Sequence, residues 1–282
     1  VRFTVDKTPP VLTLSGPADG SLHLAAQTLA WTATDASPVT TAGALDGLAI
    51  ASGAVVATEG DFVWTVRAED AAGNVTTQTR RFGIDASAPV VTLLAPPEGA
   101  YVRGPVVLDW TVTDAHPGPV VALLDGSLVT NPLTVTTEGL HALAVTATDA
   151  LGNTASASRS FTLDDTPPVI TVSGVTDGAL LRGPVSPTFS ATDSSLAQVS
   201  ATLNGAPFLS GALVSADGFF VLWVEAVDRA GNTSTRLIQF TLDVTPPVIQ
   251  VTGVVNGQVS ALPLTPFFTA TDAHLAQVSA TL

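Results

Sequence analysis

The chain has 282 residues, of which only 12% are charged, yet its net charge is −14 because 24 acidic residues oppose 10 basic ones. A charge of this sign repels phosphate backbones and disfavours nucleic-acid binding, whereas it can attract cations. The hydrophobic fraction of 46% is sufficient for packed cores, and the absence of cysteine excludes disulfides and thiolate metal sites. No apolar stretch reaches the ~18 residues of a membrane-spanning helix.

A proline-containing linker recurs four times at a constant spacing of 79 residues, and its copies begin at Asp6, Asp85, Asp164 and Asp243. Two further markers keep the same spacing. One is a D-x-x-G-N segment that begins at Asp70, Asp149 and Asp228. The other is an S/T-x-T-D segment that ends at Asp35, Asp114, Asp193 and Asp272. Three markers with one period identify a tandem repeat.

The repeat predicts where the domains begin and end. Residues 1–5 (VRFTV) match the last strand of a repeat and are expected to end a preceding copy. Complete repeats follow at 6–84, 85–163 and 164–242, and residues 243–282 match the first half of a fourth. We therefore expect a longer array, with further copies on both sides.

Period-two alternation of apolar and polar residues predicts β-strands throughout. In the strand before Asp35, Leu29, Trp31 and Ala33 alternate with polar or small residues, so Trp31 should point inward. Trp110, Phe189 and Phe268 hold the same place in the later copies. Turn signals every ~8–12 residues then describe an all-β fold of antiparallel sandwiches with about seven strands each.

The D-x-T-P-P linker, the TATD strand end and the D-A-x-G-N hairpin resemble those of bacterial Ig-like tandem domains, with some similarity to cadherin repeats. The resemblance covers the whole chain and implies tandem Ig-like β-sandwiches. Antibody-type Ig domains differ, because they carry a cysteine pair that is not found here.

Ig topology brings the linker, the loop after the second strand and the F–G hairpin to one end of each sandwich. In the second repeat that end is expected to hold Asp85, Asp114 and Asp149, and in the third Asp164, Asp165, Asp193 and Asp228; Asp243 and Asp272 are their counterparts in the fourth. The opposite ends carry Asp19, Glu59, Glu98, Glu138, Asp177 and Asp217. If the repeats stack end to end, each junction gathers about five carboxylates.

Such a concentration of like charge favours a bound cation, and Ca²⁺ takes 6–8 oxygen ligands in flexible geometry. The resemblance to cadherins and to bacterial Ig-like adhesins implies Ca²⁺ at these junctions. The alternative is that each aspartate only caps its own turn or ends its own strand.

No catalytic pattern is visible. His116 and His274 share a repeat position with Ser37 and Ser195, so a catalytic imidazole is not expected there, and no G-x-S-x-G segment occurs. Trp223 points outward by alternation, which favours a contact surface for a partner or a neighbouring filament strand. The alternative is a shift in the alternation or a loop that covers this tryptophan.

These observations favour a non-catalytic, structural stalk or fibre segment of a large bacterial surface or adhesin protein, secreted or displayed on the cell surface. Its expected partners are neighbouring repeats of the same chain. A self-assembling filament or sheath subunit, in which identical chains associate, is the first alternative. A glycan-binding accessory module of a secreted enzyme is the second.

Overall fold

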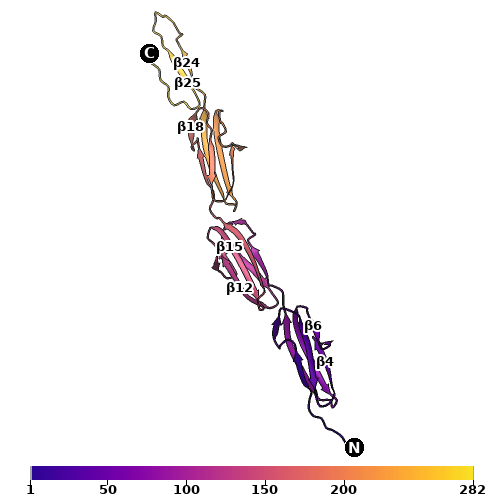
Figure 1. The fold of residues 1–282 in the computed structure, drawn as a ribbon. Coiled ribbons are helices and arrows are strands. Elements are labelled where there is room, and N and C mark those ends of the chain that lie inside the picture. Colours follow the sequence, from indigo (N-terminus) through magenta and orange to yellow (C-terminus); the bar gives the residue numbers. More distant parts are fainter. Residues whose placement is uncertain (1, 282) are drawn as a thin grey trace. The chain divides into compact units, whose positions relative to one another are not determined.

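The computed structural model describes residues 2–281, which form 25 strands and no helix (Figure 1). No helix that could span a membrane occurs among these residues. Contacts divide the chain into two compact units. One contains residues up to Ala100, Pro105–Thr136 and Leu140–Phe161, and the other contains Tyr101–Gly104, Thr137–Gly139 and residues from Thr162 onward. The predicted boundaries at 79-residue spacing stay a prediction.

The first repeat is a sandwich of two sheets. One sheet has the order β1-β3-β6 and the other β2-β8-β7-β4-β5. Strand β2 pairs with β8 in parallel, and the other strand pairs of these two sheets are antiparallel. This is the strand order of an Ig-like domain with strands A, B and E facing A′, G, F, C and C′. The strands are β1 (Val11–Ser15), β2 (Ser21–His23), β3 (Gln27–Thr34), β4 (Val39–Leu45), β5 (Leu48–Ile50), β6 (Ala54–Val56), β7 (Gly60–Asp70) and β8 (Val75–Ile84).

The second repeat has the same two sheets, β14-β11-β9 and β10-β16-β15-β12-β13. Each of these two repeats therefore has eight strands among the described residues, one more than predicted, because a three-residue edge strand such as β2 is too short to show alternation. The strands are β9 (Val90–Ala95), β10 (Ala100–Val102), β11 (Val106–Thr113), β12 (Pro117–Leu124), β13 (Ser127–Leu128), β14 (Leu133–Val135), β15 (Gly139–Asp149) and β16 (Thr154–Leu163).

The third repeat has seven strands, with sheets β17-β19 and β18-β23-β22-β20-β21. An isolated bridge between Val185 and Val214 lies outside the strands. These strands are β17 (Val169–Ser173), β18 (Ala179–Arg182), β19 (Thr188–Thr192), β20 (Leu196–Leu203), β21 (Ala206–Pro207), β22 (Gly218–Asp228) and β23 (Thr233–Asp243). In the rest of the described chain, β24 (Val248–Thr252) and β25 (Phe267–Thr271) form one two-stranded sheet.

The core of each complete repeat lies between its two sheets, where the alternation predicted it. Trp31 and Trp110 are buried, and Trp64 and Val66 of β7 are fully inaccessible. Each large apolar side chain buried in this way contributes about 1.5–3 kcal/mol. Phe189 is partly buried against the third core. The expectation that Phe268 also packs inward is wrong: its side chain is exposed, because no second sheet faces β24 and β25 in the described residues.

Tight turns fix the register of the sheets. The loops between β4 and β5, β12 and β13, and β20 and β21 are Asp46-Gly47, Asp125-Gly126 and Asn204-Gly205, and both residues of each pair have positive φ. A two-residue hairpin of this kind needs positive φ twice, which Asn-Gly and Asp-Gly tolerate best. The hairpin β7–β8 turns at Gly73, which also has positive φ, so its D-x-x-G-N segment is the predicted turn.

Candidate metal centres

The fold brings an aspartate from each of three loops together at one end of each complete sandwich. One is the first residue of the linker, the second follows strand B, and the third begins the F–G hairpin. Their ligand atoms lie within 4.8 Å of one another in three groups: Asp6, Asp35 and Asp70; Asp85, Asp114 and Asp149; and Asp164, Asp193 and Asp228. We call these the three-aspartate groups. The predicted proximity of these loops is confirmed, including in the first repeat, whose aspartates were not among the predicted ligands.

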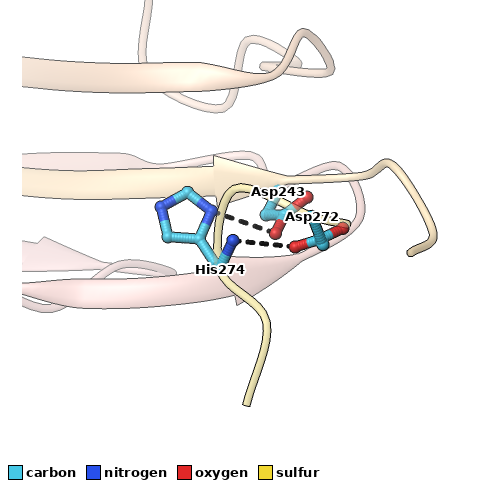
Figure 2. A group of neighbouring side chains, drawn as sticks. All are labelled: Asp243, Asp272 and His274. Atoms are coloured by element: carbon cyan, nitrogen blue, oxygen red, sulfur yellow. Dashed lines mark hydrogen bonds and ion pairs between the residues drawn. The ribbon is translucent and has the colours of Figure 1, made fainter. Parts of the chain in front are cut away.

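A fourth group consists of Asp243, Asp272 and His274 (Figure 2). The Nδ1 atom of His274 lies 3.1 Å from an oxygen of Asp243, and its backbone N–H donates to Asp272 at 2.7 Å. Asp243 and Asp272 were predicted to lie together, whereas His274 was not assigned a role. No hairpin aspartate joins this group among the described residues.

The hairpin aspartate is held by its own turn. One oxygen of Asp149 accepts hydrogen bonds from the backbone N–H groups of Leu151 and Asn153, both at 2.8 Å, and the other accepts one from the Asn153 side chain at 2.6 Å. Burial raises the pKa of Asp149, but these hydrogen bonds outweigh it, so the pKa lies below its usual value. The pKa of Asp70 is lowered as well, chiefly by the Asn74 side chain.

The loop aspartate forms an Asx turn. Asp193 accepts a hydrogen bond from the backbone N–H of Ser195 at 2.6 Å, and Asp114 accepts one from His116 at 2.8 Å. An Asp side chain commonly bonds the backbone two residues later in this way. The turn uses only one carboxylate oxygen of each aspartate, so the turn itself leaves the second oxygen available to a ligand.

The linker aspartate forms a hydrogen bond with His116 in the second repeat and with Ser195, the equivalent residue, in the third. Asp85 is 3% exposed and lies 2.8 Å from Nδ1 of His116, whereas Asp164 accepts the Ser195 hydroxyl at 2.5 Å. This role was not predicted, because alternation between histidine and serine at one repeat position was taken as a sign of no function. Histidine and serine can both donate a hydrogen bond to a carboxylate, and this shared property could have predicted the contact with the linker aspartate from the sequence.

His116 also reaches a second carboxylate. Its Nε2 atom lies 3.1 Å from an oxygen of Asp61, a residue of β7. The hydrogen bonds to Asp85 and then to Asp61 raise the pKa of His116 above its usual value, although burial opposes them. A protonated His116 therefore offsets part of the negative charge of the second group. Ser195 holds the same position in the third repeat and carries no charge.

The acidic residues predicted at the opposite ends cap backbone N–H groups. Asp19, Glu98 and Asp177 accept hydrogen bonds from the last strand of their own repeat, at the backbone of Arg81, Ser160 and Gln239. Glu59, Glu138 and Asp217 accept them from the linker that follows, at the backbone of Ala86, Asp165 and Val244. None of these six belongs to a group of mutually close ligand atoms among residues 2–281. That about five carboxylates gather at each junction stays a prediction.

Asp165, predicted beside Asp164, accepts a hydrogen bond from the backbone N–H of Gly104 at 3.0 Å instead of joining the group. The side-chain and backbone hydrogen bonds of Ser160 lower the pKa of Glu98. These caps explain why acidic residues recur at fixed places without a shared ligand: each satisfies a backbone donor at a strand end or a linker.

The three-aspartate groups fit a calcium ion in their donor chemistry. All of their ligand atoms are carboxylate oxygens, and a separation of up to 4.8 Å is compatible with one ion bound to oxygens at about 2.3–2.6 Å. Two carboxylates at that separation repel by about 3 kcal/mol at an effective dielectric constant of 20. Across residues 2–281, no lysine or arginine forms a salt bridge with these aspartates.

A scan against protein-family models and a search of curated proteins gave no match. Among solved structures, the chain is similar to a three-domain Ig fragment of titin, a mutated variant, at 14% identity and a TM-score of 0.45, covering 85% of this chain and 100% of that one. It is also similar to part of a 1.5-MDa bacterial ice-binding adhesin (18% identity, TM-score 0.31, 85% and 100% covered) and to protocadherin gamma B2 domains 3–6 (13%, 0.37, 90% and 77%).

The assignment of the fold rests on the strand order of the repeats, because these similarities are distant. Two sheets with Ig strand order recur at a constant interval in the sequence. The chain is an all-β protein of tandem Ig-like sandwich domains, as predicted.

Proposed function

We propose that this chain is a non-catalytic structural segment of an extracellular, bacterial stalk or fibre that spaces another module from the cell surface. The observation that carries the proposal is the recurrence of one sandwich and one linker. Repeat proteins of this kind have a stability that is roughly the sum of unit and neighbour contributions, so they lengthen by adding copies.

The linkers support this proposal because hydrogen bonds hold their first residues. The backbone N–H of Asp85 donates to the carbonyl of His23 at 2.9 Å, and Glu59 accepts hydrogen bonds from the backbone of Ala86 and the hydroxyl of Ser87. In the next linker, the backbone N–H of Asp164 donates to the carbonyl of Val102 at 3.0 Å. Proline then fixes φ after these residues, which leaves little free chain to act as a flexible hinge.

Electron microscopy and single-molecule pulling of the chain test the proposal. A stalk segment should appear as isolated beaded threads and should unfold in separate steps, each releasing roughly 270 Å of extended chain for a 79-residue repeat. Helical bundles would instead favour the filament alternative. Loss of all structure in one step without resistance would contradict a mechanical role.

We also propose that the three-aspartate groups bind Ca²⁺ and stiffen the loops that they join. Asp193→Asn tests this directly, because an asparagine side chain can still accept the hydrogen bond from Ser195 but has no charge. Calcium should raise Tm relative to EGTA in the unmodified chain, and D193N should reduce that increase. Asp109→Asn is the matched control, since it removes the same charge outside every group. An equal Tm in calcium and EGTA would contradict the proposal and leave the aspartates as turn caps.

A further inference from the structure

The outer face of the five-stranded sheet in the third repeat is unusually apolar. Leu222 and Val224 of β22 point into the core and are inaccessible, so the residues between them point outward. Phe219 is 57% exposed and Trp223 is 43% exposed. Trp223 pairs with Leu237 of β23 on one side and Thr202 of β20 on the other, and Leu237 is 45% exposed. The predicted outward orientation of Trp223 is confirmed, and the structure adds Phe219 and Leu237 to its surface.

The fold does not require these aromatic side chains. The positions equivalent to Phe219 and Trp223 hold Asp61 and Thr65 in the first repeat, and Leu140 and Ala144 in the second. All three repeats form the same hairpin between strands F and G. In the second repeat Leu140 is 73% exposed, but the second position holds only the methyl group of Ala144. Among residues 2–281, the third repeat alone has two exposed aromatic side chains at these positions, which marks a contact site rather than a structural need.

The size of the patch argues against a second protein as its occupant. A half-exposed aromatic side chain offers roughly 100 Å², so Phe219, Trp223, Leu237 and the exposed Leu180 together offer about 400 Å². A stable protein–protein interface buries about 800 Å² on each partner. A second copy of this chain would also bring another net charge of −14.

The polarity of the face points to a neutral ligand. Four rows of paired side chains cross it, starting at Phe219, Val221, Trp223 and Glu225 of β22. Uncharged hydrogen-bonding groups accompany the apolar ones: Thr241 pairs with Phe219, and Gln239 pairs with Val221. Within these described rows, Glu225 alone is charged. A ligand with apolar faces and hydroxyl groups, and without charge, matches this surface.

We propose that this face binds a neutral oligosaccharide, with Trp223 as the main stacking platform and Phe219 as the second. The two residues are four positions apart on one strand, which separates their Cα atoms by about 13 Å. The CH faces of sugar rings pack against the two aromatic rings. Gln239, Thr241 and Thr202 exchange hydrogen bonds with the sugar hydroxyls. The third repeat is then a binding module within the array.

Intrinsic fluorescence of the complete chain measures this binding, because the other three tryptophans, Trp31, Trp64 and Trp110, are buried. The probes are cellohexaose, laminarihexaose, mannohexaose and xylohexaose at millimolar concentration. At least one should shift the emission saturably. Trp223→Ala should weaken the binding measured by calorimetry roughly tenfold, and Phe219→Ala by a few fold.

Thr65→Ala and Leu140→Ala are matched controls at the equivalent positions of the other repeats, and they should bind as the unmodified chain does. Circular dichroism checks the fold of each variant, and Trp223→Phe, which keeps a ring, should retain more binding than W223A. Failure of all four sugars to bind the unmodified chain overturns the proposal. Equal affinity of W223A overturns it as well. A concentration-dependent association in sedimentation that W223A removes, without sugar binding, would identify a second copy as the occupant and also overturn it.

Discussion

Residues 196–203 and 275–282 have the same sequence, LAQVSATL, yet residues 275–281 differ in structure from residues 196–202. The first copy is strand β20, which pairs with β22 and β21. Residues 275–281 form no strand, and Leu282 lies outside the described residues. Identical local preference therefore gives a strand only where a partner strand supplies hydrogen bonds and a facing sheet covers the apolar side.

The strands that precede the two copies, unlike the copies themselves, form the same pairs in both regions. Strands β17 and β19 pair in register from Val169 with Thr192, and β24 and β25 pair in the equivalent register from Val248 with Thr271. Burial nevertheless differs: Ile170 is 9% exposed, whereas its counterpart Ile249 is 65% exposed. This strand pair and the Asx turn after it form in both regions, while the core needs the second sheet.

Adding the partner strands of the third repeat to residues 243–282 should produce the largest change. Appending a further copy of residues 204–243 directly after Leu282 gives β24 and β25 the sequence that forms β22 and β23 in the third repeat. Amide hydrogen exchange of residues 275–281 should then slow by roughly three orders of magnitude, since stable domains open with several kcal/mol. A shuffled version of the same segment should not protect them. Unchanged exchange with the native segment would refute the view that a partner strand decides whether these residues form a strand.

Truncating matched core positions should separate the two regions. Leu222→Ala removes an inaccessible side chain from the third core and should cost about 2–5 kcal/mol in the free energy of unfolding of that repeat. Ile249→Ala should change stability by less than about 0.5 kcal/mol, because Ile249 is mostly exposed. Urea denaturation followed by residue-resolved hydrogen exchange measures both. A similar cost at the two positions would mean that residue 249 is also covered in solution.

Removing the hairpin cap should have an intermediate effect. Asp228→Ala leaves the backbone N–H of Asn232 without its acceptor, and both residues are buried. The expected cost is about 1–3 kcal/mol. Exchange should accelerate in β22 and β23 and stay unchanged in β24 and β25. Asp228→Asn, which can still accept that hydrogen bond, is the milder control and should lie between the alanine variant and the unmodified chain.

The pH dependence of residue 116 should give the smallest effect. Because the folded pKa of His116 is raised, its contribution to stability is complete below the unfolded pKa of about 6.5 and is lost as the pH rises through the folded pKa. An NMR titration should place the His116 midpoint above that of a model histidine, and His116→Ser should remove this step. The third repeat, with Ser195 at this position, should show no such step from that residue. A midpoint at or below the usual pKa of a histidine side chain would contradict the bridging geometry.

For Asp70 and Asp149 the pKa shift, and with it the pH dependence of stability, has the opposite sign to that of His116. Their folded pKa values are lowered, so the stability that they contribute is present above the unfolded pKa of about 3.9 and is lost as the pH falls through the folded values. Acid unfolding of the first two repeats therefore tests the hairpin caps Asp70 and Asp149 at a pH where His116 stays protonated. The contribution of these aspartates to stability is thereby separated from that of His116.

The sequence by itself determined the repeat, the β class, the inward tryptophans and the meeting of three aspartates. These follow from period-two alternation, turn chemistry and the fixed topology that the repeat resembles. Short edge strands such as β2, the bridge from His116 to Asp61 and the apolar face around Trp223 were decided only by the tertiary structure. Cross-strand pairing sets which side chains become neighbours, and pairing depends on residues far apart in the chain. Residues 196–202 therefore form a strand, whereas residues 275–281, with the same sequence, do not: hydrogen bonds and burial come from partners that no local sequence contains.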